Sequence, residues 1–448
     1  MKLEMNKNEL AGALSALGKL ICRTSPVEAF RSVQIEGKEN KVTLRTANTD
    51  ESIAFSIAAE VPEPFQVRVN FDDFRTAVRG GRNKSLTFSL ENGLFAVDGM
   101  MLRPVEDTLP DVPSPANDCI SSALPSGFVS LLATMAPLVD RNNYREYLKG
   151  IHLCPEGLVV TNGKELLHIP QELTLVPLTL PFPLALLATK CEADGMISTW
   201  SEQATRYFSI ELGGWKWTGK ALNGTYPNWK TIVPDSSILT HVVKFNAESV
   251  ARLMEFLKKV PDASPANPIT LSENSDGHLL LIAENEMRCS VPAEFSAPWN
   301  DFSIIVSKAI LARLLGKGHT QIACENENAP FIATQGIGTY AAMPLAHRIP
   351  KTIQPPNTEE NKMNENSSNT VTAPVQSVAN TPNPEPAPSV TLDDLASAVD
   401  ELKAKFKLLF DDANTLSRKI KEVALTQKQK ERDFILAKRA IERIRMAI

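Results

Sequence analysis

Side chains that could catalyse a reaction or bind a metal are scattered along this 448-residue chain. Structural zinc sites and redox motifs need Cys or His residues only a few positions apart. The residues in question are Cys22, Cys119, Cys154, Cys191, Cys289, Cys324, His152, His168, His241, His278, His319 and His347. The cysteines lie tens of residues apart and the histidines are isolated. We therefore interpret the cysteines as buried thiols and expect no metal and no cofactor.

One glycine-rich stretch, Gly316-Lys317-Gly318-His319, superficially resembles a phosphate-binding loop. It lacks the eight-residue frame in which backbone amides surround a phosphate and Lys follows the second Gly. We interpret it as the end of a helix, because glycine tolerates the left-handed conformation found there. Gly80-Gly81 is expected to end another helix in the same way. The sequence predicts a non-catalytic protein, although a catalytic pair assembled only by folding is left open.

Lysine and arginine recur on, or just after, six segments with helical periodicity. If these helices line one surface, that surface holds a phosphate backbone without reading its sequence, by releasing counterions. The helices lack aromatic stacking platforms, which favours duplex over single-stranded DNA. The alternative is that the cations merely occupy solvated helix faces. The predicted DNA contacts are Arg23, Arg75, Arg79, Arg141, Arg145, Lys149, Lys190, Arg252, Lys308, Arg313 and Lys317.

A repeat of 120 residues organises the elements that carry these cations. Asn6, Ser126 and Asn246 each precede a helical pattern and can accept hydrogen bonds from the first-turn amides. Strand-like stretches follow each helix, and Pro137 is expected to end the middle one. A shorter helix with further strands comes about 55 to 65 residues later, at 70–81, 181–191 and 307–318. This pattern predicts an α+β fold of three similar domains, each made of two helix-plus-small-sheet units.

Length and composition fit this organisation. A chain of 448 residues exceeds one ordinary core. The formal net charge of −5 confines any DNA contact to a local basic surface. The first residues have no apolar core of signal-peptide length, and no apolar run is long enough to span a membrane. We expect a cytoplasmic protein without membrane contact, with domains at 1–120, 121–236 and 237–350.

Beyond residue 350 the composition changes. Residues 351–389 are rich in Asn, Thr, Ser and Pro, which predicts a disordered linker. Residues 390–448 begin with a capping-box pattern at Thr391 and Asp394 and carry apolar residues in 3-4 spacing. Gln427 and Lys430 interrupt this spacing, which otherwise predicts a coiled coil. Its partner is unknown: a second copy, another protein or its own basic half. A single helix packed on the body is the alternative.

Three stretches resemble landmarks in the middle domain of the bacterial beta sliding clamp, the beta subunit of DNA polymerase III. These are the segments 145–150 (REYLKG), 161–163 (TNG) and 224–234 (GTYPNWKTIVP). The segment 340–345 (YAAMPL) resembles the last strand and tail of that family. The resemblance covers nearly four-fifths of the chain. It implies a head-to-tail homodimeric ring with helices inside, through which duplex DNA passes, with Arg23 and Arg145 as the best-matching DNA-facing positions.

The resemblance also implies an apolar pocket between the second and third domains. Such a pocket suits the short hydrophobic peptides by which DNA polymerases and the clamp loader hold clamps. Taken as bare sequence, its residues would be ordinary core. The implied pocket residues are Leu148, Thr161, Gly163, Leu166, Pro227, Ile232, Ala341, Met343, Pro344 and Leu345.

Two departures from the family pattern affect the expected function. Lys164 and Glu165 stand where the family has a His-Arg pair, and the chain continues about a hundred residues past Leu345. We expect a DNA sliding clamp, a processivity factor associated with the nucleoid. The alternative is a clamp-derived scaffold or regulator, possibly of a mobile element, that recruits or sequesters replication proteins through its coiled coil. For the dimer contact we expect Met254, Phe256 and Leu257.

Overall fold

The computed structural model describes residues 2–346, apart from 82, 92, 111, 112, 114, 116–118, 300 and 301. The predicted linker at 351–389 and coiled coil at 390–448 lie outside these residues. Within them the same order of elements occurs three times: a strand, a helix, four strands, a second helix and three strands. We call the three occurrences the first, second and third repeats, at residues 2–119, 120–236 and 237–346. The domain boundaries themselves stay a prediction.

The first repeat starts with a strand that leads straight into a helix. Asn6 caps that helix, because its side-chain oxygen accepts from the amide of Asn8 at 2.9 Å. Asn70 caps the second helix in the same way, accepting from Asp72 at 2.9 Å. The elements are β1 (Lys2–Asn6), α1 (Lys7–Leu17), β2 (Ser32–Lys38), β3 (Lys41–Ala47), β4 (Glu51–Ala58), β5 (Phe65–Asn70), α2 (Phe71–Gly80), β6 (Ser85–Glu91), β7 (Leu94–Val97) and β8 (Met100–Leu102).

The second repeat has shorter helices. The helix before Pro137 ends at Met135, as expected, and a 3-10 turn, Ala136–Leu138, follows. Ser126 is not its cap: Gly127 holds that position at φ 67°, and the Ser126 hydroxyl donates to Asp194. The elements are β9 (Ile120–Ala123), α3 (Phe128–Met135), β10 (Gly150–Cys154), β11 (Gly157–Thr161), β12 (Glu165–Pro170), β13 (Leu178–Pro181), α4 (Leu184–Thr189), β14 (Gly195–Glu202), β15 (Thr205–Leu212) and β16 (Trp215–Lys220).

The third repeat adds one short strand to the pattern. Asn246 caps its first helix, accepting from Ser249 at 2.8 Å. Phe256 and Leu257 are buried on that helix, so they belong to the core and not to the predicted dimer contact. The elements are β17 (His241–Lys244), α5 (Ala247–Lys259), β18 (Pro268–Glu273), β19 (Leu279–Ala283), β20 (Arg288–Val291), β21 (Glu294–Phe295), β22 (Ser303–Ser307), α6 (Lys308–Gly316), β23 (Gln321–Cys324), β24 (Phe331–Gly336) and β25 (Gly338–Ala342).

The two glycine-rich helix ends differ. Gly318, just after α6, has φ 80°, the left-handed value expected of a helix-ending glycine. Gly81 ends α2 at φ −57°, a backbone conformation that any residue can adopt. A larger residue is disfavoured at this position by close packing, because a Cβ there would lie 2.3 Å from Leu86. The cysteines also differ from the expectation, because only Cys154 and Cys324 are buried, while Cys22 is exposed.

The strands form four antiparallel sheets, two of which connect successive repeats. Sheet order is β1-β6-β7-β8, β5-β2-β3-β4-β16-β15-β14-β9, β13-β10-β11-β12-β25-β24-β23-β17-β21 and β20-β19-β18-β22. We call the strands between the two helices of a repeat its middle strands, and the strand before the first helix and the three after the second its outer strands. The middle strands of one repeat join the outer strands of the next, through β4 with β16 and β12 with β25. Two four-stranded sheets are left without such a neighbour: β1-β6-β7-β8 in the first repeat and β20-β19-β18-β22 in the third.

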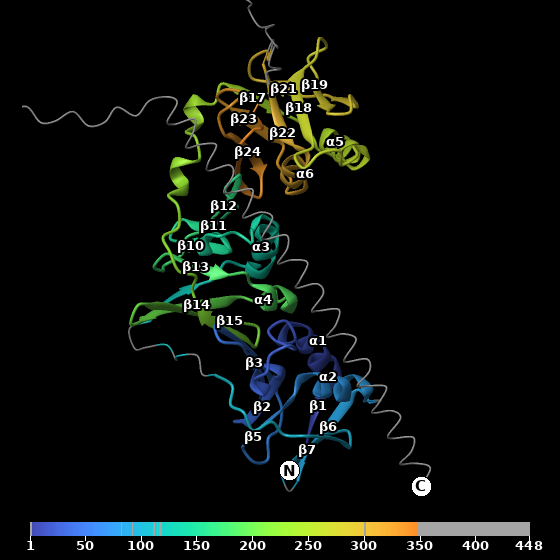
Figure 1. The fold of residues 1–448 in the computed structure, drawn as a ribbon, viewed down its shortest axis with the longest axis vertical. Coiled ribbons are helices and arrows are strands. Elements are labelled where there is room, and N and C mark those ends of the chain that lie inside the picture. The colour runs from blue at the N-terminus through green and yellow to red at the C-terminus, as the bar shows by residue number, and fades with distance from the viewer. Residues whose placement is uncertain are drawn as a thin grey trace, which may run out of the picture. The chain divides into compact units, whose positions relative to one another are not determined.

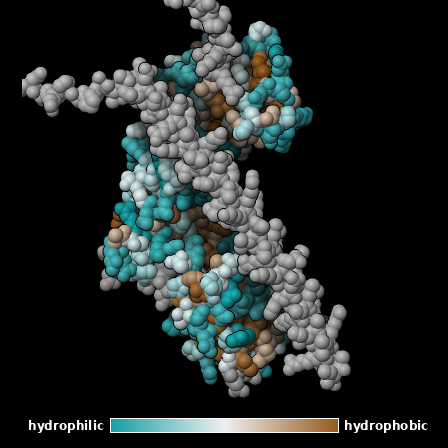
Figure 2. Space-filling view, in the orientation of Figure 1, coloured by the Kyte–Doolittle hydropathy of each residue, from teal (hydrophilic) through white to brown (hydrophobic). Residues whose placement is uncertain are grey.

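The helices pack on one another beside these sheets. In Figure 1, α1 lies beside α2 and also close to α4, and α3 lies beside α4, on the same side of the neighbouring strands. In the third repeat α5 packs against α6. Apolar helix and strand residues form a continuous core that includes fully buried Phe74, Phe88 and Trp217. The face seen in Figure 2 is mostly hydrophilic, with small hydrophobic patches between. The side of each helix that points away from the strands is therefore the side that faces outward.

Candidate functional site

Two of the predicted pocket residues meet where β12 of the second repeat pairs with β25 of the third. Leu166 and Ala341 are direct partners in this pairing, and both are 2% exposed. Together with Cys154 and Val159 they form a small apolar cluster, separate from the main core. Tyr226, Trp229 and Val233 pack against the edge of this cluster.

Exposed apolar side chains accompany this buried cluster. Ile232 is 39% exposed and Met343 is 43% exposed, both unusual for large apolar groups. Pro227, which lies between Tyr226 and Trp229 in the chain, and Pro344 are half-buried. A buried apolar floor and exposed apolar side chains from two repeats are what a site for a hydrophobic peptide needs.

The turn between β11 and β12 is fixed by its own polar groups. Thr161 donates to the carbonyl of Glu165 at 2.7 Å and accepts from the amide of Gly163 at 3.1 Å. Asn162 accepts from the amides of Lys164 and Glu165. Gly163 has φ 88°, a conformation that favours glycine. The segment 161–163 is thus a rigid turn that delivers β12 to its pairing with β25.

One predicted pocket residue, Leu345, lines another cavity, and a second, Leu148, is not in the buried cluster of Leu166. Leu345 turns to the third repeat, where its amide donates to the carbonyl of Ile305 at 2.7 Å. It lines a different cavity, of about 690 Å³, together with Pro265, Pro268 and Ile282. Leu148 is buried at the end of the 3-10 turn Glu146–Leu148 and is not part of the Leu166 cluster.

Glu165 is the centre of a polar contact between the second and third repeats. Only 3% of it is exposed. Arg313 of α6 donates to both of its carboxylate oxygens, one of them at 3.0 Å, and the hydroxyl of buried Tyr340 donates to it as well. Asn162 supplies a further donor at 2.8 Å. The carboxylate is therefore fully paired, as a buried charge must be.

The surroundings of this contact shift several pKa values. Burial raises the pKa of Tyr340, and the adjacent Glu165 carboxylate adds to that rise. Burial alone would lower the pKa of Arg313, yet its bond to Glu165 raises it above the usual value. Burial lowers the pKa of Lys317, whose ammonium donates to the carbonyl of Thr134 in α3. Burial also lowers the pKa of His319 to about 4. Arg313 and Lys317 thus both connect α6 to the second repeat.

The predicted DNA contacts fall into two groups. Lys308 has an 18% exposed side chain and donates to the Val260 carbonyl and to Asp262, so, like Arg313 and Lys317, it already has an internal partner. The other eight are exposed or half-exposed: Arg23, Arg75, Arg79, Arg141, Arg145, Lys149, Lys190 and Arg252.

The exposed cations concentrate in the connections that follow the helices. Neither α3 nor α4 contains a charged residue. In the loop after α3, the guanidinium of Arg145 lies 5.1 Å from the centre of the Tyr144 ring, and that of Arg141 lies 4.8 Å from the Phe182 ring. Tyr144 is 82% exposed. Sequence reasoning missed it, because a single loop tyrosine has no pattern that marks it.

The described part of the chain offers no metal centre: no three His, Cys, Asp or Glu side chains group there in a way that could hold an ion. Among the same residues, no helix has the length and apolarity to cross a membrane.

Comparison with solved structures identifies the fold. No family model and no curated protein sequence matches the chain. A Helicobacter pylori beta clamp bound to a DNA ligase peptide matches with TM-score 0.64 and 18% identity, over 77% of this chain and 100% of that one. A Pseudomonas aeruginosa sliding clamp bound to griselimycin matches with TM-score 0.66 and 16% identity, over 77% and 99%. The Bacillus subtilis DNA polymerase sliding clamp matches with TM-score 0.65 and 13% identity, over 77% and 99%.

These matches show which fold the chain has. The chain has the DNA-clamp fold of the bacterial sliding clamps, in an α+β arrangement that the sequence pattern had predicted. Among the solved proteins that share it, the one from Pseudomonas aeruginosa is named as the beta subunit of DNA polymerase III, and it is 16 to 17% identical to this chain.

Proposed function

We propose that this protein is a DNA sliding clamp, a non-catalytic processivity factor that encircles duplex DNA and tethers a DNA polymerase. The observation that carries the proposal is the way each repeat joins its sheet to the next one. A polymerase bound to a ring on DNA re-engages before it diffuses away, because its effective concentration stays high. The proposed place of action is the cytoplasm, at the nucleoid DNA.

The two four-stranded sheets left without a neighbour support a head-to-tail homodimer. Inside the chain, β4, at the end of the group β5-β2-β3-β4, pairs with β16, at the end of the group β16-β15-β14-β9. The same rule matches β20 of one copy with β8 of another. The side chains of Met100 and Met101 on β8 are 46% and 57% exposed, so that edge offers apolar surface. Applying the rule twice closes a ring of two chains.

For the DNA contact we propose the eight exposed or half-exposed cations, from Arg23 to Arg252, and add Tyr144. Arg23 and Arg75 share Asp72, at 3.1 and 2.9 Å, so their guanidinium groups already lie together. Such contacts would hold phosphates of any sequence and weaken with salt. We assign a structural role to Lys308, which joins two elements of the third repeat, and to Arg313 and Lys317, which join the third repeat to the second.

For partner binding we propose the site around Leu166 and Ala341, with Pro227, Ile232, Met343 and Pro344 at its rim. The H. pylori clamp that shares the fold was solved with a DNA ligase peptide. By analogy, short hydrophobic peptides of a polymerase and a clamp loader are the proposed ligands here.

One observation favours a second candidate function, a clamp-derived scaffold or regulator. The helices α3 and α4 carry no charge, so the proposed inner surface is less basic than the sequence pattern suggested. Such a protein would recruit or sequester replication proteins without sliding on DNA, through the predicted coiled coil and its unknown partner.

Loading onto DNA distinguishes the two. The full-length protein, given a bacterial clamp loader and ATP, should remain on nicked circular DNA and leave after the circle is cut. It should also lengthen the products made by the cognate polymerase. Failure of both would reject the sliding clamp and leave the scaffold. Retention that is equal on circular and linear DNA would show ordinary electrostatic binding instead.

A further inference from the structure

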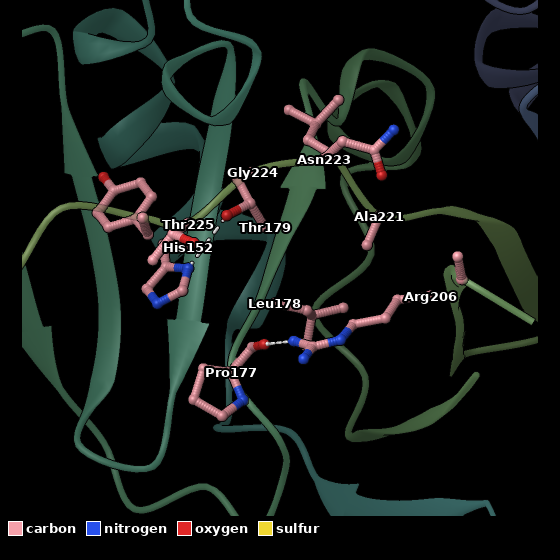
Figure 3. A pocket seen from close by; sticks show the side chains of 12 residues that line it. His152, Pro177, Leu178, Thr179, Arg206, Ala221, Asn223, Gly224 and Thr225 are labelled. Atoms are coloured by element: carbon pink, nitrogen blue, oxygen red, sulfur yellow. Dashed lines mark hydrogen bonds between the residues drawn. The ribbon is translucent and has the colours of Figure 1, made fainter.

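A cavity of about 480 Å³ lies on the second repeat, between β10 and β13 on one side and β15 on the other. Figure 3 shows His152 and Thr179 facing the side chain of Arg206 across it, with Asn223 above. The segment 221–226, which follows β16, completes the lining. None of the lining residues is acidic. All of them belong to the second repeat, so the cavity does not depend on a partner or on another repeat.

Arg206 gives the cavity its charge. Its guanidinium donates to the carbonyl of Pro177, as Figure 3 shows. Among the described residues no carboxylate lies within ion-pair distance of it, and the side chain is exposed. A guanidinium has five N–H donors, so most of them are available to a ligand. The cavity therefore presents a cation whose counter-charge the described chain does not supply.

The opposite wall is neutral and preorganised. His152 is 9% exposed, its Nδ1 lies 3.1 Å from the hydroxyl of Thr179, and its ring stacks on Tyr226 at 4.2 Å. Burial, with a contribution from Arg206, lowers the pKa of His152 to about 4. The imidazole is thus uncharged at neutral pH, and Arg206 is the charged group of the lining.

The exposed segment 223–225, which lines the cavity, has backbone amides without a partner among the described residues. In the described structure, the amides of Asn223, Gly224 and Thr225 have no acceptor. Three consecutive amides of this kind normally bind water or a ligand. Gly224 has φ 105°, and a Cβ there would lie 2.8 Å from the Tyr147 ring. The backbone is thus held in a conformation that only glycine adopts easily.

We propose that this cavity binds a small oxyanion, a carboxylate or a phosphate group. Arg206 supplies the counter-charge, with the planar fork that suits two oxygens, and the segment 223–225 supplies hydrogen-bond donors. Leu178 and Ala221 offer the apolar surface for the carbon atoms next to a carboxylate. Anion binding here is independent of whether the protein encircles DNA.

A connection to the proposed peptide site follows from Tyr226. Its ring lines the cavity and also packs against the cluster of Leu166 and Ala341. An anion that orders the segment 223–226 is expected to change peptide affinity, and the peptide to change anion affinity by the same factor. This coupling rests on the proposed function, whereas anion binding does not.

Equilibrium dialysis of the full-length protein against radiolabelled phosphate, and separately against radiolabelled acetate, tests the proposal at constant ionic strength. We expect saturable binding of one anion per chain, and the preferred anion identifies the source. Arg206→Gln should weaken binding at least tenfold. Asn223→Asp should do the same by repulsion, and this exposed side chain can be exchanged without disturbing the core. Arg103→Gln, at an exposed arginine of the first repeat, is the matched control.

Absence of saturable binding of both anions would overturn the proposal, as would binding that both variants leave unchanged. Far-ultraviolet circular dichroism of each variant shows whether the fold is retained. If anions bind as expected but a DNA ligase peptide does not bind the protein at all, the proposed peptide site fails and the anion site stands.

Discussion

Glu165 and Arg313 show what one pair of residues does in this fold. The carboxylate is almost fully buried, and donors from Arg313, Tyr340 and Asn162 surround it. Removing charges from water costs solvation free energy, which their mutual attraction offsets only when the geometry is good. Removing one member of the pair and leaving the other should therefore destabilise the fold. The two residues join β12 of the second repeat to α6 of the third. The pair therefore contributes to holding these repeats together next to the proposed peptide site.

Removing either member of this pair should be costly. We expect Arg313→Met to lower the free energy of unfolding by about 3 to 5 kcal/mol, because it leaves the buried carboxylate of Glu165 without its cation. Glu165→Gln should cost less, because the side chain of Arg313 is 31% exposed and water can solvate it. The double variant should lose clearly less than the sum of the two. Urea denaturation followed by tryptophan fluorescence measures all three.

The exposed pair of Lys230 and Glu156 provides the control for that cycle. Their nitrogen and oxygen lie 2.5 Å apart, but both side chains are about half exposed. Solvent screens such a pair, so Lys230→Met should hardly change the denaturation midpoint. Strict additivity of the Glu165 and Arg313 losses would show that the two residues act separately.

His319 should make the protein sensitive to acid. Burial lowers the pKa of this residue to about 4, against about 6.5 in the unfolded chain. Between these values the unfolded state binds more protons, so the free energy of unfolding falls as the pH drops from 6.5 towards 4. Above pH 6.5 both states are neutral and the effect vanishes.

Comparing urea denaturation of the wild type with His319→Phe at pH 7.5 and pH 5 isolates this effect. The wild type should lose more stability over this interval, by at most about 2 kcal/mol, which is 1.36 kcal/mol per unit over the 1.5 units from 6.5 to 5. An equal loss in both proteins would assign the acid sensitivity to other groups.

At the scale of elements, the local patterns of the sequence predicted helices better than strands. Asn6 and Asn246 cap their helices as expected, because a cap is a contact over two or three residues. Ser126 fails, since Asp194 offers its hydroxyl a better partner far away in the sequence. The short first strand of each repeat was missed for the same reason. β1, for example, is defined by pairing with β6, some 80 residues later.

In the candidate site, too, local sequence patterns predicted some residues, whereas contacts between distant segments were not predictable. The resemblance to a clamp implies pocket residues that include Leu166, Ala341, Ile232 and Met343, and the structure places the first two side by side. Leu345 follows the backbone bond to Ile305 instead. Neither the Glu165 contact nor the cavity at Arg206 was predictable, because their partners come from segments about 150 and 30 residues away and share no spacing rule.

Single charges at the rim of the proposed peptide site should abolish peptide binding. Ile232→Lys and Met343→Lys change exposed side chains, so the body should remain folded while an ammonium group enters an apolar contact. We expect at least a tenfold loss of affinity for a fluorescent DNA ligase peptide, measured by anisotropy. Ile238→Lys, at an isoleucine that is 44% exposed in another turn, should bind normally. Unchanged affinity of both rim variants would disprove the site.

At the scale of the whole molecule, the way in which successive repeats share a sheet predicts how two copies of the chain would assemble. Every internal junction consists of the middle strands of one repeat and the outer strands of the next. The first repeat has outer strands to offer at β8, and the third has middle strands to offer at β20. Chains joined by this rule are related head to tail, and the closure of the ring then depends on the angle at each junction.

Charging the β8 edge should therefore convert a dimer into a monomer. Met100 and Met101 are exposed in the single chain, but in a dimer they would lie against β20 of a second copy. Sedimentation equilibrium should give twice the chain mass of 49.1 kDa for the wild type. The double variant Met100→Lys, Met101→Lys should give the single mass, because two ammonium groups would have to lose their water at the contact. Met196→Lys, at a methionine 46% exposed on β14, is the matched control.

The same measurement on a chain ending at residue 352 separates two sources of dimerisation. Residues 1–352 form a compact unit by themselves. If the sheet edges hold the dimer, the shortened chain should still have twice its own mass, and the methionine variant should still be monomeric in that background. A shortened chain that is monomeric without any substitution would show that residues 353–448 hold the copies together, and the ring built on β8 and β20 would have to be abandoned.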